Sequence, residues 1–145
     1  MERQELRKGV MAVIVNAENK VLIGSSPRDG GYKFPQGGLE KGENPIDGII
    51  RELEEELGVV IKETDILMHY KEKVGYDYPL DDPFYIFNRQ ELSVVKIKYD
   101  AKMDFIPQDD EFDELLWVFP DEVSNYNSYF RNKAYKRALE ICGLL

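Results

Sequence analysis

The sequence has little of what marks secreted or membrane-bound proteins. Its single cysteine, Cys142, excludes an internal disulfide, and its charged start MERQELRKGV lacks the apolar core of a secretory signal. No apolar run approaches the roughly 20 residues that a membrane-spanning helix requires. We therefore expect a protein of a reducing, cytoplasmic compartment that does not enter membranes, and no obligatory protein partner is evident.

Positive charge is also scarce. There are 19 lysines and arginines against 28 aspartates and glutamates, which gives a net charge of -9. This balance argues against a protein that coats nucleic acid, because such binding depends on many contacts from Lys and Arg to phosphates. It does not exclude a nucleotide substrate, since clustered acidic residues can recruit Mg²⁺ or a similar cation that then meets the phosphates.

The composition and the order of predicted elements fit one domain over residues 1–145. The chain is 43% hydrophobic, and no segment is rich enough in Pro, Gly or Ser to be a linker. Strands and helices alternate without strict βαβ order, which favours an α/β sandwich with a mixed sheet between helices. Apolar and β-branched runs predict strands over 9–16, 21–24, 32–34, 59–61, 66–74, 93–99 and 115–120, with an exposed loop over 25–31, a glycine-rich turn over 35–43, a helix start at Asp121 and a last helix over 130–141.

The best-specified element is a helix over residues 45–57. Asn44 is a suitable N-cap, Pro45 suits the first helical position, and Gly58 follows the last turn. Apolar residues recur at three- and four-residue spacing and form one stripe that must pack on a sheet: Ile46, Ile49, Ile50, Leu53 and Leu57. The sequence therefore predicts both ends of this helix and its buried face.

Three glutamates of this helix share one side. Glu52, Glu55 and Glu56 are spaced i, i+3, i+4, so their carboxylates crowd together at a cost of roughly 0.2–0.5 kcal/mol per pair unless a cation is present. Taken alone, the cluster is explained most simply as a solvated acidic surface. The alternative is a site for a hard divalent cation, which prefers oxygen ligands.

The surrounding residues favour the metal site. The segment GGLEKGENPIDGIIRELEEELGV resembles the Nudix box, GX5EX7REUXEEXGU with U aliphatic, and every fixed position matches: Gly37, Glu43, Arg51, Glu52, Leu53, Glu55, Glu56, Gly58 and Val59. The resemblance implies a Nudix-type α/β/α fold and hydrolysis of a phosphoanhydride with Mg²⁺ or Mn²⁺. It implies that Glu52, Glu55 and Glu56 ligate metal and that one of them often serves as base.

The same resemblance assigns two further roles around the box. The backbone carbonyl at Gly37 can join the metal ligands. Glu43 and Arg51 are expected to orient the loop and the helix through a salt bridge, and Arg51 is counted with the catalytic group. The number of metals and the identity of the base stay open.

Residues outside the box resemble one branch of the family. FPQGG at 34–38, YDYP at 76–79 and DEFDELLWV at 110–118 are similar to segments of bacterial RNA pyrophosphohydrolases and plant-type diadenosine tetraphosphate hydrolases. This likeness implies that Glu111 is a further metal ligand, against the alternative of a surface acid. It implies substrate contacts from Arg7, Tyr76, Phe130 and Arg131.

Two features depart from the RNA-hydrolysing relatives. Ser26 or Pro27 stands where several of them carry an arginine, and Arg28 is the nearest substitute. Residues 79–90 also lack the basic composition of the insertion in many of those relatives. Near Phe130, an alternative is that this ring docks the last helix and that Arg131 is solvated.

Three functions follow as hypotheses. The leading one is removal of pyrophosphate from the 5′-triphosphate end of RNA. The second is hydrolysis of diadenosine tetraphosphate and related dinucleoside polyphosphates. The third is a nucleotide-binding sensor without turnover, which the intact set Glu52, Glu55 and Glu56 disfavours.

Overall fold

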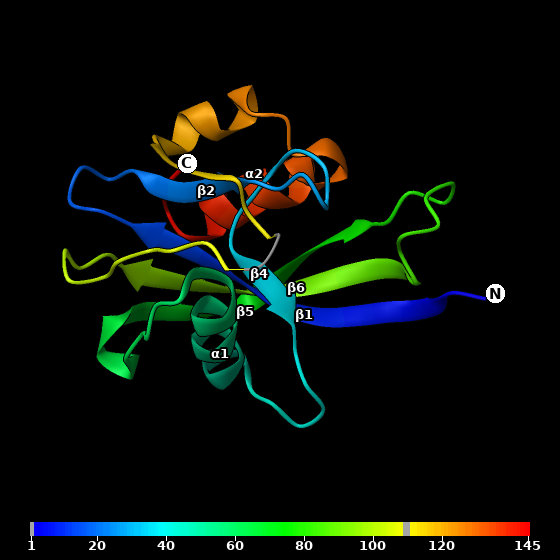
Figure 1. Ribbon diagram of the computed structural model, residues 1–145, viewed down its shortest axis with the longest axis horizontal. Coiled ribbons are helices and arrows are strands. Elements are labelled where there is room, and N and C mark those ends of the chain that lie inside the picture. Colours follow the sequence, from blue (N-terminus) through cyan, green and yellow to red (C-terminus); the bar gives the residue numbers. More distant parts are fainter. Residues whose placement is uncertain (1, 109–110) are drawn as a thin grey trace.

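Residues 2–108 and 111–145, the part of the chain that the computed structural model describes, form a seven-stranded mixed sheet with helices on both faces (Figure 1). The strand order is β3-β2-β1-β6-β5, with β4 paired to β1 and β7 paired to β2. The strands are β1 (Gln4–Val15), β2 (Val21–Ser25), β3 (Tyr32–Lys33), β4 (Gln36–Gly38), β5 (Ile66–Asp77), β6 (Phe87–Lys98) and β7 (Glu114–Val118). The helices are α1 (Pro45–Leu57) and α2 (Asn132–Ile141), with short 3-10 helices η1 (Glu63–Asp65), η2 (Pro120–Asn125) and η3 (Tyr129–Arg131).

The predicted α/β/α sandwich is confirmed. Figure 1 shows α1 below the sheet and α2 above it, and each covers its own buried cluster. Successive side chains of a strand point to opposite faces, so β1 contributes to both clusters. Val10, Ala12 and Ile14 pack on the α1 side, while Met11, Val13 and Val15 pack on the α2 side. None of the helices in the described part of the chain is both long and apolar enough to cross a bilayer.

Helix α1 has the predicted ends. The Asn44 side chain accepts a hydrogen bond from the Asp47 N–H at 2.9 Å, and Gly58 ends the helix with φ 64°, a conformation that costs glycine little. Ile49, Leu53 and Leu57 of the apolar stripe are fully buried against the sheet. The glutamates on the other side of the helix therefore have a fixed direction.

Some predicted elements were wrong. Residues 59–61 form no strand; Val59 and Ile61 are buried under α1 but pair with no strand among the described residues. The expected turn at 35–43 begins instead with β4, where Gly37 pairs with Val10 of β1. The residue pattern of one segment does not reveal such strand pairing, because the pairing depends on a partner strand that is distant in sequence.

Other elements differ at their ends. The last helix begins at Asn132 and is preceded by η3, and the helix start at Asp121 is the 3-10 helix η2. Strand β1 reaches back to Gln4 because it pairs in parallel with β6 from Phe87 onward. The longer β1, β5 and β6 carry the sheet beyond the helices, and Figure 1 shows this extension at the end near the N-terminus.

Candidate active site

A cavity of about 440 Å³ lies where α1, β4 and the extended strands meet. Its lining combines acidic, basic and aromatic side chains. They are Arg7, Arg28, Asp29, Lys33, Gln36, Gly37, Glu52, Glu55, Glu56, Tyr76, Tyr78, Phe84, Tyr85, Ile86, Phe87, Gln90, Gln108, Glu111 and Arg131. The cavity therefore contains every predicted site residue except Arg51 and Phe130.

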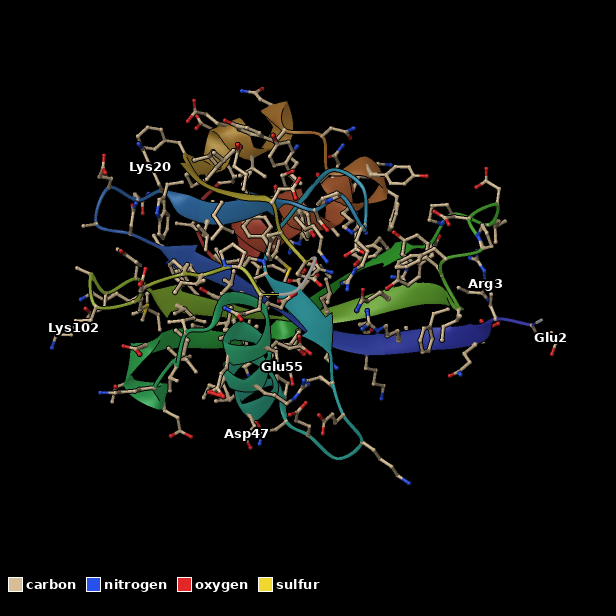
Figure 2. All side chains as sticks on the ribbon, in the orientation of Figure 1. Glu2, Arg3, Lys20, Asp47, Glu55 and Lys102 are labelled. Carbon is tan, nitrogen blue, oxygen red and sulfur yellow. The ribbon has the colours of Figure 1, made fainter. Side chains whose placement is uncertain are left out.

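The three clustered glutamates of α1 enter the cavity with different exposure. Glu56 is buried, Glu52 is nearly buried with 12% of its side chain exposed, and Glu55 is exposed at 58%. Figure 2 shows Glu55 at the end of α1 that faces β4, opposite Asp47 at the start of the helix. The carboxylates thus run from the protein interior to the mouth of the cavity.

Arg51 lies outside the cavity and binds the residues that lead into it. Its guanidinium makes two hydrogen bonds to the Glu43 carboxylate, Nη2 to Oε1 at 2.8 Å and Nε to Oε2 at 2.9 Å. It also donates to Glu52 Oε1 and to the Gly38 carbonyl, both at 2.9 Å. The expected Glu43–Arg51 salt bridge is present, and it joins the loop before α1, strand β4 and a cavity carboxylate.

This pairing shifts the ionisation of Glu43. The hydrogen bonds from Arg51 come first, and the Glu40 backbone N–H adds another; together they lower the pKa of Glu43 from 4.5 to about 2. The same contacts raise the pKa of Arg51. The pair therefore stays ionised throughout the neutral range.

Gly37 makes room for Glu52. A Cβ placed on Gly37 would overlap the carboxyl carbon and both oxygens of Glu52, so the carboxylate lies directly against the bare backbone of β4. A glycine is required here for close approach, and its φ is not unusual. The Gly37 backbone and the Glu52 carboxylate thus lie together, as the predicted ligand set requires.

A second group of charges closes the inner end of the cavity. Lys33 Nζ lies 2.5 Å from Asp29 Oδ2 and 3.0 Å from Glu111 Oε1, and all three side chains are buried. Arg28 contacts Glu111 Oε2. The Glu111 carboxyl also lies close enough to Glu56 to raise the pKa of that group. Glu111 is therefore a member of the buried site and not a surface acid.

Burial governs the ionisation of the inner glutamates. Desolvation raises the pKa of Glu56 well above its usual 4.5; Lys33 opposes this shift, and neighbouring Glu111 adds to it. Desolvation likewise raises the pKa of Glu52, and Arg51 opposes the shift. The protein places carboxyl groups where their negative charge is costly in the absence of an added cation.

The residues fit a divalent metal. Glu56 Oε1 is buried and has no hydrogen-bond partner in the described part of the chain, and the cavity carboxylates around it supply the oxygen ligands that Mg²⁺ and Mn²⁺ prefer. Within residues 2–108 and 111–145 no three acidic, His or Cys side chains yet converge as ligands. The reason is visible in the contacts: Glu52 turns to Arg51, and Glu111 turns to Arg28 and Lys33.

The opposite wall is aromatic and hydrogen-bonded. Tyr76 and Tyr78 each donate to Gln90 Oε1 at 2.6 Å, and Gln36 Nε2 donates to the Tyr76 hydroxyl at 2.7 Å. Burial raises the pKa of Tyr78 to about 12. These side chains form a hydrogen-bonded wall. Tyr76 lines the cavity, but its hydroxyl is bound within this buried network.

Phe130 and Arg131 differ from expectation. The Phe130 ring packs edge-on against Tyr76, Tyr78 and Tyr85 and does not line the cavity. Arg131 is 2% exposed, so the solvated alternative for it was wrong; its guanidinium lies 4.2 Å from the Phe130 ring centre. The docking alternative holds for Phe130, while Arg131 lines the cavity from within.

Sequence reasoning missed several lining residues. Lys33 gave one weak signal, a lysine between Tyr32 and Phe34 in an otherwise apolar strand. Asp29 lay in a segment that was expected to be only an exposed loop, and Phe84 lay in the segment of unusual composition. Their proximity follows from the pairing of distant strands, which sequence spacing does not give.

The fold and the site together define a class. An α/β/α sandwich carries a helix whose glutamates line a cavity, together with arginines, and one buried carboxylate oxygen there has no partner among residues 2–108 and 111–145. This is the arrangement of a hydrolase that acts on phosphoanhydrides with divalent metal.

Comparison with known proteins gives the family. The NUDIX domain profile matches residues 5–139, and the chain belongs to the Nudix family. It is 32% identical to the RNA pyrophosphohydrolase of a Nitratiruptor species, over 97% of this chain and 95% of the relative. Nudix hydrolases generally use divalent metal ions.

Solved structures agree on the fold. The E. coli dihydroneopterin triphosphate pyrophosphohydrolase superposes with a TM-score of 0.72 at 15% identity, covering 98% of this chain and 99% of the other. A C. elegans Ap4A hydrolase superposes with a TM-score of 0.64 at 14% identity, covering 93% and 98%. At these identities the likeness supports the Nudix fold alone.

Proposed function

We propose that this protein removes pyrophosphate from the 5′-triphosphate end of RNA with Mg²⁺ or Mn²⁺. The observation that carries the proposal is the buried Glu56, whose Oε1 has no hydrogen-bond partner among the described residues. Glu56 lies near Glu111 and on the helix of Glu52 and Glu55. The similarity to an RNA pyrophosphohydrolase over nearly the whole chain supports the RNA substrate.

The metal would be held by oxygen atoms of Glu52, Glu55, Glu56 and Glu111, together with the backbone carbonyl of Gly37. When bound, such an ion neutralises phosphate charge and lowers the pKa of a water that attacks phosphorus. One of the cavity glutamates would serve as the base that accepts a proton, and Arg51 keeps Glu52 in place through its 2.9 Å hydrogen bond.

The substrate phosphates need positive charge from the chain as well. Arg7 and Arg131 line the cavity, and both are placed to attract a polyphosphate. Arg28 is committed to Glu111 in this structure and reaches the phosphates only if that contact opens. We therefore assign phosphate binding first to Arg7 and Arg131, and Arg28 acts mainly as the partner of Glu111.

The test is a panel of substrates under identical conditions. 5′-Triphosphate RNA, diadenosine tetraphosphate and ADP-ribose are each incubated with the protein and Mg²⁺, Mn²⁺ or EDTA. We expect the highest kcat/KM on the RNA, with no turnover in EDTA. A higher kcat/KM on diadenosine tetraphosphate would favour the dinucleoside polyphosphate hydrolase, because the same cavity accepts a polyphosphate flanked by nucleosides.

Binding separates enzyme from sensor. Tight binding of any of the three molecules without turnover in either metal would overturn the enzyme and support a nucleotide sensor. Glu55→Gln is the matched negative control, because it removes one expected ligand from an exposed position without disturbing the core.

A further inference from the structure

The loop between β5 and β6 places an exposed aromatic ring at the mouth of the cavity. Phe84 lines the cavity although its side chain is 55% exposed, and Ile86 beside it is 49% exposed. Both lie in the segment between Tyr78 and Phe87 that joins the two extended strands. A large apolar surface at the entrance of a charged cavity calls for a ligand with an apolar face.

The loop is anchored. Arg3 Nη2 donates to the carbonyls of Pro79 and Asp82, both at 2.7 Å, and Figure 2 shows Arg3 near the N-terminus, just before β1. The Asp82 side chain accepts from the Phe84 N–H at 3.0 Å. The backbone that carries Phe84 is therefore tied to β1 and to its own turn.

The ring next to Phe84 is also fixed. Tyr85 stacks on Tyr78 with 4.6 Å between ring centres, and its hydroxyl donates to the Asp29 carbonyl at 3.2 Å. Phe84 meets Tyr85 edge-on, at 80° between the ring planes. Phe84 is thus supported on one edge and otherwise open to the cavity mouth.

Phe130, the aromatic ring for which the sequence predicts a substrate contact, already packs against other side chains. It packs against four tyrosines, and Arg131 lies over its face. A base could reach it only after Arg131 moved out of a position in which it is 2% exposed. Among the cavity residues, Phe84 offers an aromatic face at no such cost.

We propose that Phe84, with Ile86 beside it, is a nucleobase-stacking subsite for the nucleotide whose phosphates bind at the glutamates of α1. The inference rests on the proposed function for the identity of the substrate, but the subsite itself requires only a nucleotide. Stacking on an aromatic ring accepts any base, because every base has a π-face. The subsite therefore contributes affinity and position and does not select a sequence.

A fluorescent variant tests the contact without turnover. Trp117, the only tryptophan, packs against Tyr99 and Phe105 and does not line the cavity. In Phe84→Trp, a new tryptophan would stand at the cavity mouth. With Ca²⁺ in place of Mg²⁺, we expect ATP to quench the new emission and inorganic tripolyphosphate, which has no base, to leave it unchanged.

Equal quenching by both ligands would overturn the subsite, since phosphate charge alone would then explain the signal. The absence of quenching while calorimetry records ATP binding would overturn it too. In the unsubstituted protein, the emission of Trp117 should not respond to either ligand, which provides the reference.

Kinetics supply the second test. Phe84→Ala should raise KM for 5′-triphosphate RNA about tenfold or more, the size expected for losing one stacked base, while kcat changes less than twofold. Leu80→Ala is the control, because Leu80 lies in the same loop, is 86% exposed and does not line the cavity. An unchanged KM in Phe84→Ala would overturn the subsite.

The two proposals fail separately. If the protein hydrolyses none of the panel but ATP quenches Phe84→Trp and tripolyphosphate does not, the subsite stands and the proposed function falls. If RNA is hydrolysed and Phe84→Ala behaves like Leu80→Ala, the proposed function stands and the subsite falls.

Discussion

The Lys33 ammonium lies 3.0 Å from Glu111 Oε1, and both residues are buried beside Glu56. Lys33 also binds Asp29, so one cation serves several acidic groups at the inner end of the cavity. Removing one partner of such a pair is expensive, at about 3–5 kcal/mol, because the remaining charge stays buried. A divalent cation in the cavity would supply positive charge from the other side.

In EDTA, Lys33→Met should therefore unfold at a lower temperature than the unsubstituted protein. Mg²⁺ should raise the melting temperature of Lys33→Met by more than it raises that of the unsubstituted protein. Thermal unfolding with and without MgCl₂ measures both effects. Lys8→Met, at an exposed position on β1, is the control and should leave both values unchanged. Equal metal-induced shifts in Lys33→Met and the unsubstituted protein would contradict this account.

Glu56→Gln separates stability from activity. Burial raises the pKa of Glu56 above its unfolded value of 4.5, so the folded state binds more protons and stability falls as pH rises through the folded pKa. The glutamine has no charge to bury. In EDTA, we expect the variant to gain stability relative to the unsubstituted protein between pH 5 and pH 8.

The same variant should lose activity, with kcat lower by about 10²-fold or more, because a ligand or base has been removed. Denaturant titrations at several pH values and steady-state kinetics test the two halves. Near-normal turnover would refute the metal role of Glu56, and a stability difference that does not change with pH would refute the buried-charge argument.

Glu43→Gln should change the acid side of the stability curve. Arg51 holds the folded pKa of Glu43 at about 2, below the unfolded value of 4.5, so this contribution is present above pH 4.5 and is lost as pH falls toward 2. The variant should be less stable than the unsubstituted protein at pH 6 and close to it at pH 2. Urea unfolding at both values checks this, and Glu54→Gln, at an exposed position on α1, should run parallel to the unsubstituted protein.

The sequence predicted those parts of the molecule that local signals determine. Asn44, Pro45 and Gly58 mark the ends of α1 within the helix itself, and the spacing of Glu52, Glu55 and Glu56 fixes their common side. The position of Glu111 near Glu56 depends on the pairing of β7 with β2, and in the sequence only the family resemblance indicates that Glu111 is a site residue. Lys33 meets Glu111 only because distant strands pair, and no local sequence pattern predicts that pairing.

Phe130 illustrates a different limit. The sequence places an aromatic residue before the last helix, but it does not reveal which other rings will cover it. The structure supplies four tyrosines and Arg131 as neighbours of Phe130, while Phe84 is a ring that lines the cavity and is 55% exposed. Side-chain exposure is a property of packing, so residue type alone does not predict which aromatic ring stays exposed at the cavity.

Two glycine variants should separate the geometry of the site from the stability of the fold. Gly37 has ordinary strand backbone, and the three atoms nearest to an added Cβ all belong to the carboxylate of Glu52, the end of a flexible side chain that can move. Gly37→Ala should therefore fold with little loss of stability. The displaced Glu52 would leave its ligand position, and a misplacement of about 1 Å lowers turnover on the order of 10²-fold.

Gly42→Ala should behave in the opposite way. Gly42 has φ 78°, a conformation that costs other residues about 1–2 kcal/mol, but nothing lies within 4 Å of its added Cβ. We expect lower stability and normal kcat on 5′-triphosphate RNA. We measure kcat and the denaturation midpoint for both variants. If Gly37 shapes the site and Gly42 shapes the loop, Gly37→Ala loses turnover but keeps its midpoint, and Gly42→Ala keeps its turnover but has a lower midpoint. Normal turnover in Gly37→Ala would refute the idea that close approach of Glu52 to β4 sets the ligand geometry.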